Sequence, residues 1–94
     1  MNIRVVRFTG VTRDSIDALK ARIESSGGPP EGVNATRITV AFDERQGTAV
    51  VVQAFPTAAD MEAGAKVLTA MDPGETPGTR DSVDSCEVVL ELNG

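Results

Sequence analysis

Histidine, tryptophan and tyrosine are all absent from this chain of 94 residues. Without histidine, the chain has no imidazole that could act as a general base or ligate zinc or haem iron. Its three aromatic side chains are all phenylalanines. The core must therefore be built mainly from aliphatic residues, and catalytic triads that use histidine are excluded.

Cysteine and basic residues are also scarce. Cys86 is the one cysteine of the sequence, which excludes an intrachain disulfide and a cysteine-rich metal site, and we expect no metal and no cofactor. The formal net charge of −5 argues against a nucleic-acid or anionic-membrane partner, because both bind basic surfaces. No apolar run approaches the roughly 18 residues of a membrane helix. The sequence predicts a soluble, cytoplasmic protein with a single domain over residues 1–94.

The two halves of the chain repeat one pattern of elements. Thr12 recurs as Thr57, and Ile16 recurs as Met61, each 45 positions later. A helical stretch separates two β-branched runs in each half, and such runs favour strands. The runs cover residues 3–8, 36–42, 48–55 and 83–92. The order βαββαβ predicts an α+β protein with the ferredoxin-like fold, in which two helices cover one face of a four-stranded antiparallel sheet.

Local signals mark where the helices begin and where the chain turns. Thr12 and Thr57 are typical N-cap residues, and Asp60 follows Thr57 by three positions, as in a capping box. Gly27 opens a Gly/Pro-rich stretch that should end the first helix. Residues 43–47 join two strands and predict a hairpin, with a glycine at its end for a positive φ.

The strand over residues 48–55 is almost continuously apolar, and Gln53 alone interrupts it. Period-2 alternation places Gln53 and Phe55 together on one face. The small side chains on the other face are Val50, Val52 and Ala54. We expect this small set to face the helices, because Gly64 would let the second helix approach closely. An apolar face that two helices leave uncovered predicts homodimerisation through that face.

The stretch over residues 71–81 combines two Pro-Gly turns with polar side chains. These polar side chains are Asp72, Glu75, Thr76 and Arg80. One interpretation is a ligand lip or a partner contact, and the other is a rigid connector that leads to the last strand. In that last strand Cys86 falls in register with apolar residues, which predicts a buried and unreactive thiol.

Residues 50–61 have the sequence VVVQAFPTAADM, an apolar strand that ends in an aromatic and continues through a turn and a capping residue into a helix. Together with the element order and the chain length, this segment resembles the dimeric α/β-barrel superfamily, which includes the antibiotic-biosynthesis-monooxygenase-like domains. The resemblance implies a homodimer whose two sheets pack face to face. It also implies a pocket between each sheet and its helices, or at the shared interface.

For the oxygenases of that family, the resemblance implies a polar cavity lined by an aromatic ring, an amide and a cation. Phe55, Gln53 and either Arg4 or Arg7 match these roles, although the chain has no histidine or tyrosine. Two functions remain open. The first is a non-catalytic homodimeric module that binds a small apolar ligand or a protein partner through the sheet face. The alternative is a cofactor-independent monooxygenase or isomerase.

Overall fold

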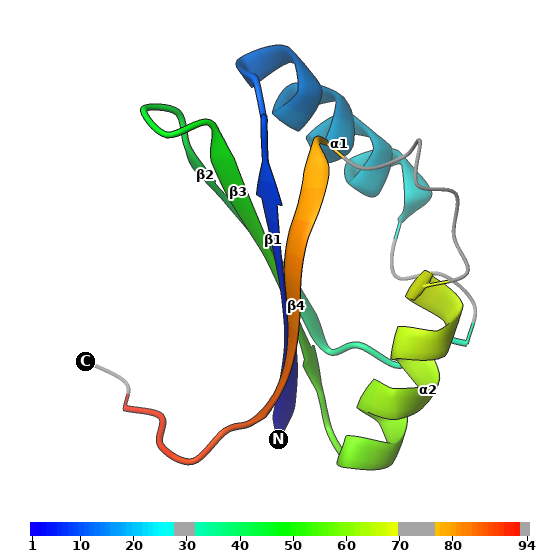
Figure 1. Cartoon of the computed structure of the whole chain (residues 1–94). Coiled ribbons are helices and arrows are strands. Elements are labelled where there is room, and N and C mark those ends of the chain that lie inside the picture. The colour runs from blue at the N-terminus through cyan, green and yellow to red at the C-terminus, as the bar shows by residue number, and fades with distance from the viewer. Residues whose placement is uncertain (28–31, 70–76, 93–94) are drawn as a thin grey trace.

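The computed structural model describes residues 1–27, 32–69 and 77–92, which form one sheet and two helices. The elements are β1 (Asn2–Thr9), α1 (Arg13–Ser26), β2 (Arg37–Asp43), β3 (Thr48–Phe55), α2 (Ala58–Thr69) and β4 (Thr79–Glu87). The strands lie in the order β2-β3-β1-β4, and every neighbouring pair is antiparallel. Figure 1 shows both helices on the same side of the sheet. The predicted α+β, ferredoxin-like βαββαβ fold is confirmed.

Side chains cap both helices where the sequence predicts. Oγ1 of Thr12 accepts a hydrogen bond from the backbone N–H of Ser15 at 3.1 Å, and Ser15 Oγ accepts one from the Thr12 N–H at 2.9 Å. Gly27 ends α1 with a φ of 74°, in the left-handed region that glycine adopts without strain. Before α2, Oγ1 of Thr57 accepts from the N–H of Asp60 at 3.1 Å. No helix among the described residues is long and apolar enough to cross a membrane.

Replacing Thr57 with alanine should lower the free energy of unfolding by about 1 kcal/mol, because the Asp60 N–H loses its acceptor at the start of α2. Thermal melts of the variant and the wild type measure this change. Glu62→Ala, at an exposed position of the same helix, is the control and should change stability by about 0.5 kcal/mol or less. An unchanged melting temperature for Thr57→Ala would mean that α2 does not depend on this cap.

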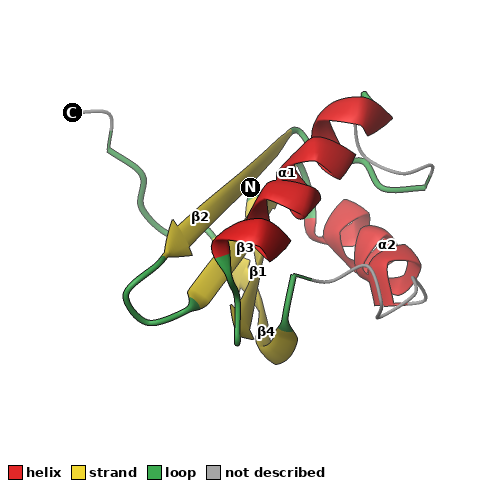
Figure 2. Cartoon of the chain, turned by 90° about the horizontal axis from the view of Figure 1, so that it is seen from above, coloured by secondary structure: helices red, strands yellow, loops and turns green. Residues whose placement is uncertain are grey.

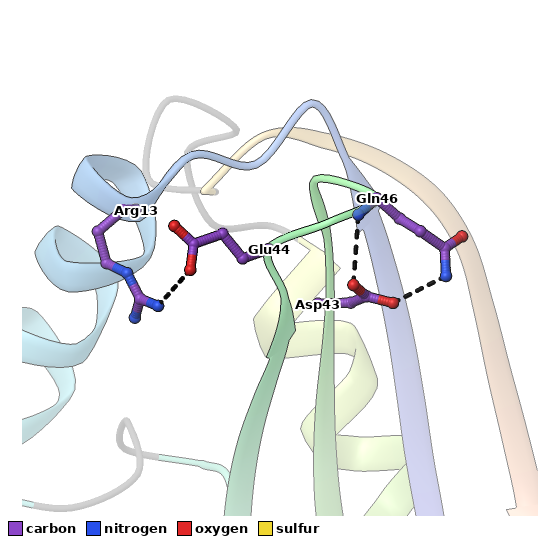
Figure 3. Close-up of polar contacts among 4 residues, drawn as sticks. All are labelled: Arg13, Asp43, Glu44 and Gln46. Atoms are coloured by element: carbon purple, nitrogen blue, oxygen red, sulfur yellow. Dashed lines mark hydrogen bonds and ion pairs between the residues drawn. The ribbon is translucent and has the colours of Figure 1, made fainter.

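Polar contacts fix the hairpin between β2 and β3 (Figure 3). Asp43 accepts hydrogen bonds from the backbone N–H of Gln46 at 3.2 Å and from its Nε2 at 2.7 Å. Glu44 pairs at 2.8 Å with Arg13, in the first turn of α1. The Arg13 guanidinium also lies 5.0 Å from the ring centroid of Phe42. The predicted hairpin is confirmed, and it is linked to the start of α1.

The two sets of β3 side chains lie on the faces of the sheet opposite to those predicted. The core beneath the helices contains Val6, Phe8, Val11, Ile16 and Ala49. Phe55 is fully buried against Gly64 of α2, so Phe55 lies on the helix side of the sheet. Gln53 shares that face by alternation, and its partner in the register is Arg4. The prediction that Gln53 and Phe55 face away from the helices is therefore wrong.

The predicted alternation along β3 is right, and the error concerns which face receives the large side chain. A Cβ added to Gly64 would lie 2.8 Å from Cε1 of Phe55. The missing side chain of Gly64 thus makes room for a large ring rather than for a small residue. Val50 and Val52 lie on the other face, turned away from both helices, which we call the outer face.

The last strand also differs from the prediction, because β4 covers Thr79–Glu87 instead of residues 83–92. β4 is an edge strand, and its neighbour β1 begins at Asn2, directly opposite Glu87. After Glu87 the alternating sequence continues, but no residue of β1 lies opposite it. Cys86 pairs with Ile3 and is partly exposed on the outer face, so the predicted buried thiol is wrong.

Candidate functional site

A cation, an amide and an aromatic ring come together on the helix side of the sheet. Arg4 of β1 lies directly opposite Gln53 of β3. Arg4 and Gln53 are each only 6% exposed, and Phe55 is fully buried two residues further along β3. We call these three residues the Arg4 cluster. α2 packs on both β1 and β3, so the cluster lies between the sheet and the helix layer.

Arg4 has fewer partners than a buried guanidinium requires. Its Nη1 donates a hydrogen bond to Oε1 of Gln53 at 3.4 Å, which is long for such a bond. Its Nε is buried and has no partner within residues 1–27, 32–69 and 77–92. Among the described residues, no carboxylate forms an ion pair with Arg4. Burial lowers the pKa of Arg4, and repulsion from the positive charge of Arg80 lowers it further.

A buried cation without an anion is an unfavourable arrangement. A guanidinium has five N–H donors and stays protonated at neutral pH even when its pKa falls. Removing such a charge from water costs several kcal/mol unless an opposite charge and good hydrogen bonds offset the loss. A bound carboxylate would supply the missing acceptors through charge-assisted hydrogen bonds. The chemistry of the Arg4 cluster therefore fits an acidic ligand.

The β4 side of the Arg4 cluster is exposed to solvent. Ser85 lies opposite Arg4, and Val83 lies opposite the core residue Val6, so both share the helix-side face. Ser85 and Val83 are nevertheless exposed, as is Arg80. Figure 2 shows the two helices on one face of the sheet, with β2 and β4 at its edges. Among the described residues, the helix-side surface of β4 beside Arg4 is therefore exposed to solvent.

The other predicted site residues are not part of the Arg4 cluster. Arg7 is on the outer face, where its Nη1 pairs with Asp81 at 2.8 Å. Arg80 is on the helix side of β4, near enough to lower the pKa of Arg4. Three residues fall outside the described part of the chain, namely Asp72, Glu75 and Thr76. Of the two cations that matched the expected cavity, Arg4 is the one beside Gln53.

The register of β4 with β1 places two further side chains beside the cluster that the sequence does not identify, Val83 and Ser85, and a β-bulge adds Arg80 to their face. The β1–β4 register shifts between Arg7 and Phe8, which leaves Asp81 as the extra residue. Because of that shift, Arg80 lies on the same face as Val83 and Ser85, although simple alternation would separate them. Nothing in the local sequence marks this bulge, and only the paired strands reveal it.

Comparison with solved structures finds a protein of the same fold. That protein is a MhuD mutant, whose crystal structure has two manganese protoporphyrin IX molecules bound per active site. The match covers 100% of this chain and 100% of the MhuD chain. Its TM-score is 0.67 and its sequence identity is 16%. This likeness confirms the ferredoxin-like βαββαβ fold. No family model and no curated protein matches the chain.

Proposed function

We propose that this chain is a small-molecule-binding domain, with the Arg4 cluster as its site and a ligand that combines an apolar body with an acidic group. The supporting observation is the buried Nε of Arg4, which has no partner among the described residues. Buried polar groups in native proteins are nearly always hydrogen-bonded. An anionic ligand would satisfy this donor, and the exposed side chain of Val83 would contact the apolar body.

The proposed ligand site is separate from the proposed dimer interface. The outer face carries apolar side chains that are only partly buried, namely Ile3, Val5, Val50 and Val52. Contiguous apolar surface of this kind marks interaction sites in proteins. We propose that a second copy of the chain covers the outer face, so that the protein is a homodimer with one helix-side ligand site in each protomer.

The likeness to MhuD favours a second candidate, oxygenase chemistry of the antibiotic-biosynthesis-monooxygenase-like type. The protoporphyrin bound by that protein is a planar apolar ring with carboxylate side chains. Arg4 and Arg80 fit such carboxylates, since both are cations on the helix side. The sequence has no histidine, so a haem iron held by imidazole does not fit this chain. The part of a porphyrin that fits is its acidic edge.

Absorbance titration with manganese protoporphyrin IX and with its dimethyl ester tests the proposed binding. The ester keeps the ring and the metal but blocks the acidic groups. A hydrogen bond to a charged group contributes about 1.5–3 kcal/mol, so the free acid should bind about tenfold more tightly or better. Naphthoate and its neutral amide form a second, smaller pair of probes. Equal affinity for the acid and the neutral member of both pairs would contradict the proposal, as would no binding at all.

A further inference from the structure

The helix-side surface of β4 changes its chemical character along the strand. It carries a cation at one end, then an apolar and a neutral polar side chain, and an acid at the other end. These side chains are, in order, Arg80, Val83, Ser85 and Glu87. All four are exposed, and we call them the β4 row. The buried guanidinium of Arg4 lies beside this row, because Arg4 is the partner of Ser85 in the register.

Arg80 is a second cation without an anion. Among the described residues it forms no ion pair. The carboxylate next to it in the sequence, Asp81, pairs with Arg7 on the outer face. The charge of Arg80 also lowers the pKa of Arg4, so the two guanidinium groups repel one another. An anion at each of them would replace this repulsion with attraction.

The charges of the β4 row give a ligand of Arg4 a preferred direction. A ligand that extended toward Glu87 would bring its body to a like charge if it carried a second acidic group. In the other direction it would cross Val83, which is 42% exposed, and would reach Arg80. Charge complementarity therefore favours a ligand that runs from Arg4 over Val83 to Arg80.

The strand register gives an approximate distance between the two cations. Arg80 lies opposite Phe8, and the positions of Arg4 and Phe8 are about 13 Å apart along β1. Side chains stand roughly perpendicular to a sheet, so this spacing carries over to their ends. A hydrogen bond of about 3 Å at each end would leave roughly 7 Å between two acidic groups. Such a separation fits acids at opposite ends of a two-ring body, rather than on neighbouring atoms.

We propose that the ligand of the Arg4 cluster is a dicarboxylic acid with its two acidic groups at opposite ends of a planar apolar body. The inference rests on the function proposed above and names its ligand class. Arg4 binds the first carboxylate, Val83 contacts the apolar body and Arg80 binds the second carboxylate. Arg80 is thus the residue that distinguishes a diacid from a monoacid.

Three naphthalene acids test this assignment with the full chain. They are 2-naphthoate, 2,6-naphthalenedicarboxylate with acids at opposite ends, and its 2,3-isomer with adjacent acids. The chain has no tryptophan or tyrosine, so titration can follow naphthalene fluorescence over a low protein background. The 2,6-diacid should bind about fivefold more tightly than 2-naphthoate, which is the upper range for an exposed ion pair. It should also bind more tightly than the 2,3-isomer, although the two isomers carry the same charge.

Arg80→Met should remove the preference for the 2,6-diacid and leave the affinity for 2-naphthoate unchanged. Arg80 is exposed, so the variant should keep the circular dichroism spectrum of the wild type. Arg37→Met is the matched control, because Arg37 is also an exposed arginine of an edge strand but lies at the opposite edge of the sheet. This control should bind all three probes as the wild type does.

The outcomes separate this inference from the function on which it rests. Equal affinity of the wild type for 2-naphthoate and the 2,6-diacid would overturn the second acidic contact and leave the acidic site standing. A 2,3-isomer that binds as tightly as the 2,6-isomer would overturn the separation of the two acids. A preference for the 2,6-diacid that persists in Arg80→Met would overturn the role of Arg80. Absence of binding for all three probes would overturn the proposed site as well.

Discussion

Replacing Arg4 with methionine should weaken binding of manganese protoporphyrin IX about tenfold or more, because the acidic groups lose charge-assisted hydrogen bonds worth about 1.5–3 kcal/mol. The same change should leave the free energy of unfolding unchanged or raise it. In the described part of the chain, buried Arg4 has one long hydrogen bond and its Nε has no partner, and an apolar side chain of similar length removes the cost of burying that charge. Absorbance titration and urea unfolding measure the two effects.

Arg7→Met is the matched control for Arg4→Met. It changes the net charge equally and lies on the same strand, but on the outer face, where Arg7 pairs with Asp81 and both side chains are well exposed. Arg7 lies outside the helix-side site, so this variant should lose no affinity for the porphyrin. Equal loss of affinity in the two variants would show that net charge, rather than a site, governs binding. Wild-type affinity in Arg4→Met would remove Arg4 from the site.

Replacing Gly64 with valine should lower the free energy of unfolding by about 3 kcal/mol, through overpacking of the core beneath α2. The added Cβ would lie 2.8 Å from Cε1 and 3.2 Å from Cζ of the Phe55 ring. Phe55 is fully buried, so its ring has no solvent-filled space into which it could move. Valine has a better helix propensity than glycine, but this gain offsets less than about 1 kcal/mol of the cost. Urea unfolding measures the difference.

The double variant Gly64→Val, Phe55→Leu shows whether the clash with the ring is the cause. A smaller side chain at position 55 leaves room for the valine, so the two substitutions should be less destabilising together than the sum of their separate effects. Strict additivity would mean that Gly64 and Phe55 do not compete for the same space. Wild-type stability of Gly64→Val would contradict the close approach of α2 to β3.

Features with a local cause can be predicted from the sequence of this chain. A threonine before a helical stretch caps it whatever the rest of the fold does, and Thr12 and Thr57 both do so. The turn over residues 43–47 and the bounds of β3 follow from equally local signals. The order of these elements then restricts the topology to few arrangements, of which the ferredoxin-like fold is one.

Features that depend on non-local neighbours could not be predicted. Alternation separates Gln53 and Phe55 from the small residues of β3, but the direction in which each set points depends on α2 and Gly64. The end of β4 depends on where β1 begins, and the alternating sequence beyond Glu87 gives no sign of it.

The candidate site shows the same division between local and non-local information. The resemblance to a known superfamily implies a cavity lined by a cation, an amide and an aromatic ring, and the sequence offers candidates for each. Arg4 and Arg7 lie in the same strand, and the sequence does not show which of them is the cation of the site. The register that pairs Arg4 with Gln53 distinguishes them. The positions of Val83 and Ser85 follow from their register with β1, and the face on which Arg80 lies follows from a bulge that the sequence does not mark.

The Nε–H signal of Arg4 in a proton–nitrogen correlation spectrum is the most direct test of the proposed site. The signal is assigned by its absence from the spectrum of Arg4→Met. On addition of metal-free protoporphyrin IX, it should move downfield and exchange more slowly with water, because a carboxylate accepts from a donor that has no partner among the residues that the structure describes. The Arg7 signal should stay in place. An unchanged Arg4 signal in a sample that has bound the porphyrin would contradict the proposed site.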